Sequence, residues 1–488
     1  MARKAKRAFS PEIGAFIERY VDELVNGKAS VFVGAGMSVA AGFVNWKGLL
    51  KEVAAELGLD VDRETNLVAL AQYHLNERNN RSVLNQKILA EFTEDQQLTT
   101  SHHVLARLPI GHYWTTNYDR LIETALVQEQ RRPDVKFSVE QMKLGKPGHD
   151  AIVYKMHGDV EHPESAILTK DDYEGYFREH EHFVTALSGD LVQTTMLFLG
   201  FSFTDPNIDY VLSRVRVTLR KKPKNHYCVL CKLQRAAREK LENFEYRKRQ
   251  QEYLIKDLSR IGIQSLMIDD YNEVPLLLSA IESRYRQRTV FVSGAAHTFP
   301  APWDPARAHQ FLSGLSAALI RKRLNVVTGF GLGVGTSIVS GALETILGNP
   351  GRYREKQLQA SPFPVSADSR TRRPLFRQHR EKILAKCGIA IFAFGTKLEG
   401  KKVVEAKGMR EEFDIARQDG LIVIPVGATG GVAKELWVQA AARFDEFYPN
   451  ASPAFARNFK TLGREAAAPE DLIRALTSMI DELRRQTF

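Results

Sequence analysis

Cysteine is scarce in this chain, with three among 488 residues. Three cysteines cannot build a disulfide framework or a four-cysteine zinc site. Cys228 and Cys231 form a C-x-x-C pattern, but they lie in a predicted strand, where residues three apart point to opposite faces. We therefore expect core cysteines, no metal site and a reducing compartment.

Long hydrophobic runs are also missing. The longest apolar stretches, MLFLGF and GIAIFAF, have the length of strands and fall far short of the roughly 20 residues that span a membrane. The basic start, MARKAKRAFSPEIG, lacks the apolar segment of a signal peptide. With 44% hydrophobic and 26% charged residues, the composition is typical of a globular protein, which we expect in the cytoplasm without membrane contact.

Acidic residues are outnumbered by basic ones, and the net charge of +10 raises the question of nucleic-acid binding. Basic runs occur at 220–224, 246–250 and 284–288. They lack the interleaved aromatic stacking platforms that bind single-stranded nucleic acids. We interpret them as solvated surface and expect no nucleic-acid partner; a polyanion site is the alternative.

Strand-like apolar segments alternate with helical segments along most of the chain, which predicts α/β domains with parallel sheets. The length exceeds that of one ordinary core, and a domain boundary is predicted near 284–289. The first domain, 1–283, opens with a helix capped by Ser10 and ended by Gly27, and it contains a helical insertion at about 59–108. A charged helix is predicted over 235–260, and the second domain covers 284–488.

Four polar motifs each follow a predicted strand of the first domain: GAGMS at 34–38, TTNYD at 115–119, MHGD at 156–159 and GFSFTDPNI at 200–208. The carboxyl ends of parallel strands are where open α/β sheets bind ligands, so the motifs predict one crevice. A glycine turn alone has a purely structural alternative, because any tight turn favours glycine.

The order and spacing of these motifs resemble the sirtuins over about residues 15–283. The resemblance implies a sirtuin-like Rossmann domain that binds NAD⁺ as substrate. It places phosphates beside Gly34, Ala35, Gly36 and Ser38, the nicotinamide ribose beside Asn117 and Asp119, and the adenosine ribose beside Ser202. Asn117 and His157 would be the catalytic residues.

The chemistry of these residue types agrees with that assignment. Backbone N–H groups of a glycine-rich turn can hold a pyrophosphate. Cleavage of the bond between nicotinamide and ribose passes through an oxocarbenium-like state. An asparagine can hold the ribose or a water without charge, and a neutral histidine can accept a hydroxyl proton near pH 7. A satisfied core amide and a core histidine are the alternatives.

Two departures from the sirtuin pattern bear on the reaction. The four-cysteine zinc module of deacylating sirtuins cannot exist here, and GFVNWK at 42–47 replaces their G-I-P-D-F-R. The W-K-G-L ending and LFLGFSFTDPNI are instead similar to sirtuin-like domains of bacterial anti-phage effectors, in which water is the acceptor. The resemblance thus implies hydrolysis of NAD⁺ to nicotinamide and ADP-ribose, with NAD-dependent protein deacylation as a disfavoured alternative.

The second domain has its own glycine-rich segment, VVTGFGLGVGTSIVSGALE at 326–344, between a strand and a helix. Small residues there allow close approach of a phosphate, although a structural loop is the alternative. Arg373, Arg377 and Arg380 are spaced i, i+4 and i+7, so one helix face would present all three, either as a phosphate clamp or as solvated surface. Lys397 in a turn and Glu411-Glu412 opening a helix could complete a nucleotide pocket.

Residues 289–480 resemble the SLOG domains, Rossmann-like relatives of the lonely-guy nucleotide hydrolases. Behind a sirtuin-like domain, this arrangement resembles the two-domain effectors of the Thoeris anti-phage defence system. The resemblance implies activation by a cyclic ADP-ribose isomer that a TIR-domain protein makes, no permanently bound cofactor, and a homo-oligomer of four or more chains. The activator would contact Gly329, Gly331, Arg377, Arg380, Lys397 and Glu412. A non-catalytic nucleotide sensor or assembly module is the alternative function.

We predict that the purified chain holds no stoichiometric zinc, because its three cysteines cannot supply a four-cysteine site. Elemental analysis of metal per chain measures this. One zinc per chain would contradict the interpretation of the cysteines and reopen protein deacylation.

Overall fold

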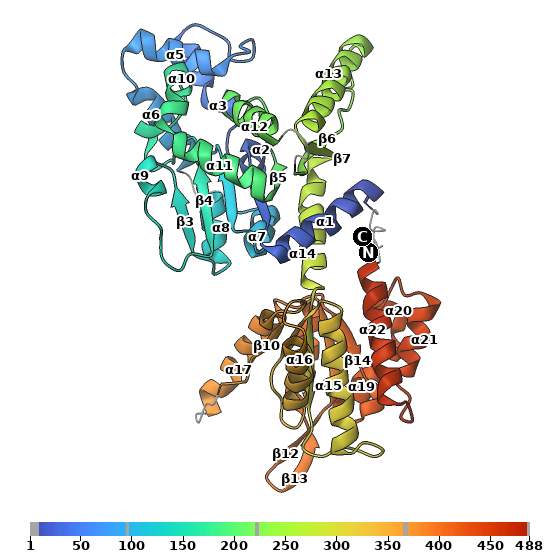
Figure 1. Cartoon of the computed structure of the whole chain (residues 1–488). Helices are drawn as coiled ribbons and strands as arrows, with labels where there is room; N and C mark the ends of the chain where they lie inside the picture. The colour runs from blue at the N-terminus through green and yellow to red at the C-terminus, as the bar shows by residue number, and fades with distance from the viewer. Residues whose placement is uncertain (1–8, 94–96, 220–223, 365–368, 486–488) are drawn as a thin grey trace. The chain divides into compact units, whose positions relative to one another are not determined.

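A computed structural model describes residues 9–93, 97–219, 224–364 and 369–485 (Figure 1). The chain divides into two compact units, Phe9 to Glu282 and Ser283 onward, and each has its own parallel sheet. Among the described residues, none of the helices combines the length and the apolar character needed to cross a membrane.

The first unit is built on a seven-stranded sheet with the order β3-β4-β2-β1-β5-β6-β7, in which all paired strands are parallel. The strands are β1 (Ala29–Val33), β2 (His112–Thr115), β3 (Pro133–Lys136), β4 (Ala151–Lys155), β5 (Thr195–Leu199), β6 (His226–Cys231) and β7 (Ile263–Ile268). Every residue of β1 and β5 is buried, as expected of central parallel strands covered on both faces.

Helices pack around this sheet. They are α1 (Pro11–Asn26), α2 (Ala35–Val39), α7 (Thr100–Arg107), α8 (Leu121–Gln128), α9 (Val139–Met142), α10 (Lys170–Glu179), α11 (Glu181–Gln193), α12 (Pro206–Leu219), α13 (Leu241–Arg260) and α14 (Val274–Arg286). The predicted start and end of α1 are confirmed, because Ser10 Oγ accepts the N–H of Ile13 and Gly27 adopts φ 67°.

The predicted helical insertion is confirmed. It contains α5 (Leu67–Arg78) and α6 (Ser82–Phe92), preceded by α3 (Trp46–Leu49) and α4 (Lys51–Glu56). These short helices share an apolar cluster that includes Leu50, Leu70 and Ile88 and reaches Tyr118, in the loop after β2. The insertion therefore packs directly behind a loop that carries predicted site residues.

Two local predictions need correction. The charged helix α13 begins at Leu241 rather than at 235. Arg235 donates to the backbone carbonyl oxygen of Glu239, and Arg247 pairs with the Glu239 carboxylate. These contacts hold a turn in front of the helix. Cys228 is buried in the core, but Cys231, at the end of β6, is only partly buried.

The second unit contains a five-stranded parallel sheet with the order β10-β9-β8-β11-β14 and a separate antiparallel hairpin, β12-β13. The strands are β8 (Thr289–Ala295), β9 (Asn325–Thr328), β10 (Leu358–Ala360), β11 (Ile389–Phe394), β12 (Thr396–Glu399), β13 (Lys402–Glu405) and β14 (Ile422–Pro425). Val290 and Val292 join one core cluster and Phe291 another, so the sheet has an apolar layer on each face.

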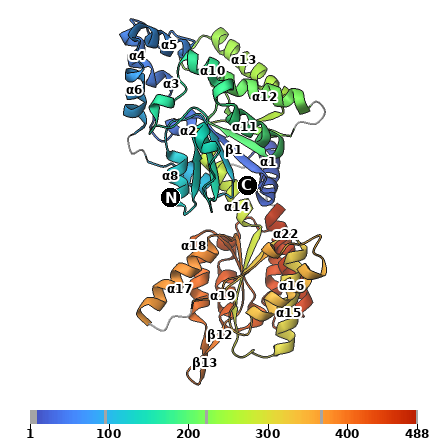
Figure 2. The same ribbon diagram turned by 60° about the vertical axis from the view of Figure 1, so that its left-hand side comes forward.

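Helices form both outer layers of this sheet. Figure 2 shows α15 (Pro305–Arg321) and α16 (Gly335–Gly348) on one side, and α17 (Ser369–Leu384) and α18 (Lys407–Gln418) on the other. The remaining helices are α19 (Gly431–Ala442), α20 (Phe444–Phe447), α21 (Pro453–Thr461) and α22 (Pro469–Arg485).

The interpretation of the basic runs as solvated surface is wrong for 284–288. Arg284 is buried and donates to the carbonyl oxygens of Leu483 and Arg484, the last turn of α22. A guanidinium suits the unpaired carbonyls of a helix C-terminus, so this arginine holds the terminal helix in place. Of the run at 220–224, residues 220–223 lie outside the described residues, and the run at 246–250 lies on α13.

Candidate functional site

The glycine loop after β1 crosses the loop after β5 at very short range. Gly34 N–H donates to the carbonyl oxygen of Leu199 at 2.8 Å, and Gly36 N–H donates to that of Gly200 at 2.9 Å. A Cβ on Gly34 would lie 2.5 Å from the Gly200 oxygen, and Gly200 itself has φ +63°. The glycines therefore have a packing role, while the predicted contact of Gly34, Ala35, Gly36 and Ser38 with phosphates stays a prediction.

Side chains from the loops after β1 and β2 form one hydrogen-bonded network. Asn117 Nδ2 donates to Ser38 Oγ at 2.8 Å, and Ser38 Oγ donates to Asp119 Oδ2 at 2.6 Å. The other Asp119 oxygen accepts the N–H of Leu121 at 3.1 Å. Three predicted site residues are thus brought together, and the orientation of the Asn117 amide is set by Ser38.

A buried lysine that the sequence analysis did not single out lies behind this network. Lys155, at the end of β4, is fully buried, and its ammonium lies 2.6 Å from Asp159 Oδ2 and 3.0 Å from Glu123 Oε1. It also donates to the carbonyl oxygens of Tyr118 at 3.0 Å and Asp119 at 2.5 Å. Its charge thus joins the loop after β2 to the turn after β4. A lysine inside the apolar strand AIVYK was the available sequence signal.

The ionisation of this cluster follows from burial and pairing. Burial alone lowers the pKa of Lys155, but the carboxylates of Glu123, Asp159 and Asp119 outweigh it and the pKa is raised. Burial raises the pKa of Glu123, and the neighbouring ammonium of Lys155 opposes that shift. The surrounding carboxylates therefore favour the charged form of Lys155 inside the fold.

His157 follows directly in the turn after β4 and is 1% exposed. Its ring packs edge-on against Tyr173 and Tyr176, with centroid separations of 5.4 and 6.1 Å. Burial lowers the pKa of His157, an effect that Asp205 opposes. Among the described residues, neither imidazole nitrogen has a hydrogen-bond partner of good geometry. A neutral, unsatisfied buried imidazole is costly unless a ligand or water completes it.

Ser202 is placed differently from the other predicted residues. It is exposed, and its Oγ lies 2.7 Å from Thr204 Oγ1. It lies in the same loop as Gly200, next to the crossing point, and its hydroxyl is bonded to Thr204 rather than to the buried network. No group of three or more His, Cys, Asp or Glu side chains that could hold a metal occurs among the residues described by the structure.

In the second unit, the glycine loop after β9 crosses the end of β8. A Cβ on Gly331 would lie 2.0 Å from the carbonyl oxygen of Gly294, and one on Gly329 would lie 3.1 Å from the ring of Phe363. The first contact alone excludes a side chain at Gly331, while the second leaves only tight space beside a phenyl ring at Gly329. Contact of Gly329 and Gly331 with an activator stays a prediction.

Arg380 and Glu412 meet beside this sheet. Arg380 Nη1 lies 2.8 Å from Glu411 Oε2, its Nε lies 3.5 Å from Glu412 Oε1, and its guanidinium lies over the ring of Phe363 at 4.8 Å. Glu412 Oε2 accepts a 2.5 Å hydrogen bond from Ser293 of β8. Burial raises the pKa of Glu412, while Ser293 and Arg380 oppose the shift.

The other predicted activator residues lie further out. The side chain of Arg377 is 57% exposed and pairs with Glu381 at 2.9 Å, and Arg373 is exposed, so Arg380 alone of the three arginines is directed inward. Lys397 lies in strand β12 rather than in a turn, with its side chain 41% exposed. Glu411 and Glu412 lie in the second turn of α18 rather than at its start.

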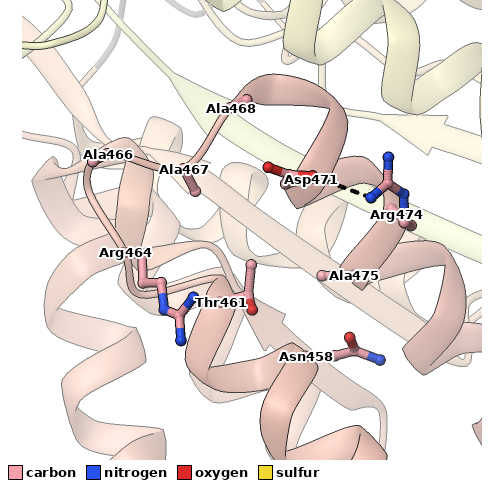
Figure 3. Close-up of a pocket in the computed structure, with 9 residues that line it drawn as sticks. All are labelled: Asn458, Thr461, Arg464, Ala466, Ala467, Ala468, Asp471, Arg474 and Ala475. Carbon is pink, nitrogen blue, oxygen red and sulfur yellow. Dashed lines mark hydrogen bonds and ion pairs between the residues drawn. The ribbon is translucent and has the colours of Figure 1, made fainter.

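A hollow of about 570 Å³ lies between the end of α21 and the start of α22. Figure 3 shows Arg464, Asp471 and Arg474 around it, with an ion pair of 3.3 Å between Asp471 and Arg474. None of the predicted site residues lines it. The hollow is therefore separate from both candidate sites.

Two family models match the chain. The SIR2-like domain matches residues 111–255, which include Asn117, His157 and Ser202, and the Sir2- and TIR-associating SLOG family matches residues 273–483. The predicted α/β fold class, a sirtuin-like domain followed by a SLOG domain, is therefore confirmed. The glycine loop at 34–38 lies outside the matched range.

Relatives that match nearly the whole chain identify its family more narrowly. The NAD(+) hydrolase ThsA of Bacillus cereus (strain MSX-D12) is 44% identical, and that of Acinetobacter baumannii (strain 532279) is 43% identical, each over 97% of this chain and 99% of the relative. The chain belongs to the ThsA family of NAD(+) hydrolases. Defense-associated sirtuin 2 of Bacillus subtilis is 26% identical over 41% of this chain and 20% of its own length.

We predict that Lys155→Met destabilises the first unit by about 3–5 kcal/mol, because it leaves buried carboxylates without their cation. Chemical denaturation followed by circular dichroism measures the free energy of unfolding. Lys170→Met, at an exposed position on α10, is the matched control and should change it by about 0.5 kcal/mol or less. Equal stability of the two variants would show that the buried cluster contributes nothing net.

Proposed function

We propose that this chain hydrolyses NAD⁺ to nicotinamide and ADP-ribose, with Asn117 and His157 as its catalytic residues. The observation that carries the proposal is the buried imidazole of His157, whose nitrogens make no hydrogen bond of good geometry within the described residues. It lies in a turn that Lys155 joins to the Asn117–Asp119 loop. The names of the full-length relatives support the activity.

The reaction breaks the bond between the ribose C1′ carbon and the nicotinamide nitrogen. The bonding electron pair leaves with nicotinamide, which becomes neutral, and the ribose gains oxocarbenium character. Water then attacks C1′ and loses one proton, so NAD⁺ and water give nicotinamide, ADP-ribose and a proton. Asn117, oriented by Ser38, would hold the ribose or the water, and neutral His157 would accept a hydroxyl proton.

Water is the favoured acceptor because no four-cysteine module is available to shape a peptide site. Three cysteines occur in the sequence, and Cys228 and Cys387 are buried at separate places in the two units. Protein deacylation therefore remains the disfavoured alternative.

We propose further that a cyclic ADP-ribose isomer, made by a TIR-domain protein, binds the second unit and activates hydrolysis in Thoeris anti-phage defence. The family model, described as Sir2- and TIR-associating, supports this pairing. The binding residues would be Arg377, Arg380, Lys397, Glu412, Gly329 and Gly331, with Arg380 and Glu412 as the inward-facing pair. The working form would be a cytoplasmic homo-oligomer of four or more chains.

We predict that His157→Ala lowers nicotinamide release by about 100- to 10,000-fold, the usual contribution of a general acid–base residue. Asn117→Ala should lower it by about 100-fold or more, because it removes the group that would position the ribose or the water. Nicotinamide is measured by chromatography at saturating activator. Asn243→Ala, at an exposed position on α13, is the control. Wild-type turnover by either site variant would show that the catalytic assignment is wrong.

We predict that Arg380→Ala weakens binding of the activating cyclic ADP-ribose isomer by about 10- to 150-fold, because one charge-assisted contact is worth roughly 1.5–3 kcal/mol. Calorimetric titration measures the affinity, and Arg474→Ala, 78% exposed on α22, is the control. Nicotinamide release should return to the wild-type rate at higher activator concentration, as linkage requires.

Unchanged affinity of Arg380→Ala for every isomer would contradict the assignment of the clamp. Absence of nicotinamide release by the wild-type chain with every isomer would instead favour the non-catalytic sensor. The His157→Ala variant should bind activator normally and remain inactive.

A further inference from the structure

Asp205 lies in the loop between β5 and α12 and uses its two oxygens for different partners. Oδ1 accepts the N–H groups of Asn207 and Ile208 at 3.0 and 3.1 Å, which caps the N-terminus of α12. Oδ2 lies 3.3 Å from His157 Nε2 and accepts the hydroxyl of Tyr173 at 3.3 Å. Capping thus uses one oxygen and leaves the other directed at the imidazole.

Resting on the function proposed above, we propose that Asp205 is the positioning residue of His157. Its Oδ2 accepts a hydrogen bond from the Nε2–H of the ring, which leaves the lone pair on Nδ1 to accept a hydroxyl proton of the ribose or of water. A carboxylate that fixes the tautomer of a catalytic imidazole is an established physical arrangement. The 3.3 Å contact between Oδ2 and Nε2 lacks hydrogen-bond alignment in the structure, and catalytic hydrogen bonds often tighten only as the reaction proceeds.

The other groups around His157 either interact with other residues or carry no charge. Asp172 contributes to the same electrostatic field, but it is bonded to Arg81 at 2.8 Å. Tyr173 and Tyr176 present ring faces and edges, and Tyr176 donates its hydroxyl to the carbonyl oxygen of Met156. Burial lowers the pKa of His180. Asp205 is therefore the carboxylate placed to accept a hydrogen bond from the imidazole N–H.

Asp205→Asn separates the two roles, because the amide oxygen can still cap α12 while the amide N–H₂ group replaces the acceptor that faces His157. We expect nicotinamide release by the full chain to fall by about 100-fold or more at saturating activator. The KM for NAD⁺ should change much less than kcat, because the carboxylate acts through His157.

The pH profile distinguishes positioning from a structural role. Activity needs neutral His157, so the acidic limb of kcat/KM follows the pKa of this histidine. Asp205 raises that pKa against the effect of burial; its removal should therefore shift the acidic limb to lower pH. Asp209→Asn, at an exposed position on α12, is the control and should change neither the rate nor the pH of the acidic limb. Asp205→Ser, which keeps a capping oxygen but cannot reach His157, should behave like Asp205→Asn.

A second measurement does not require activity. Nitrogen NMR of ¹⁵N-histidine-labelled full chain, with the His157 signal assigned by its loss in His157→Gln, should show the Nε2–H tautomer. Three outcomes would each overturn the proposal. They are an Nδ1–H tautomer of His157, an unchanged rate in Asp205→Asn, and a lower rate in that variant with the acidic limb at its wild-type pH. An inactive wild-type chain would overturn the proposed function instead, and the tautomer would then decide the role of Asp205.

Discussion

The buried ammonium of Lys155 joins the parts on which the first candidate site depends. One cation contacts two carboxylates and two backbone carbonyl oxygens, and these groups belong to the loop after β2, the start of α8 and the turn after β4. A buried charge is tolerated only when it is paired and hydrogen-bonded on several sides. Because Lys155 has these partners, it restricts both loops to a narrow set of positions, and Asn117 and His157 are held with them.

The glycine crossing between the loops after β1 and β5 supplies the second constraint. Backbone contacts this short leave no room for a Cβ, so Gly34, Gly36 and Gly200 keep these loops in register with their neighbouring strands. The loop after β5 then places Asp205 beside His157, while the loop after β1 places Ser38 beside Asn117. Four loops at the carboxyl ends of parallel strands thereby form one network, as the topology of an open sheet allows.

The second unit is built on the same principles. Its glycine loop also crosses a neighbouring strand end, at Gly331 and Gly294, and its charged pair, Arg380 and Glu412, is also anchored from the sheet through Ser293. Arg380 nevertheless keeps part of its charge balanced by Glu411 at the protein surface. A competing anion could replace that partner without leaving a buried charge alone, as the proposed binding of an activator would require.

The sequence by itself determined the two α/β domains, the capped first helix, the helical insertion and the residues that follow the central strands, because apolar periodicity, caps and glycine turns are local signals. It could not identify Lys155 or Asp205 as partners of the site, since a lysine in a strand and an aspartate before a proline are ordinary until distant segments meet. It also misplaced Arg284, Lys397 and the start of α13. Only the tertiary structure decided these points, because burial and pairing of charge depend on contacts between residues far apart in the chain.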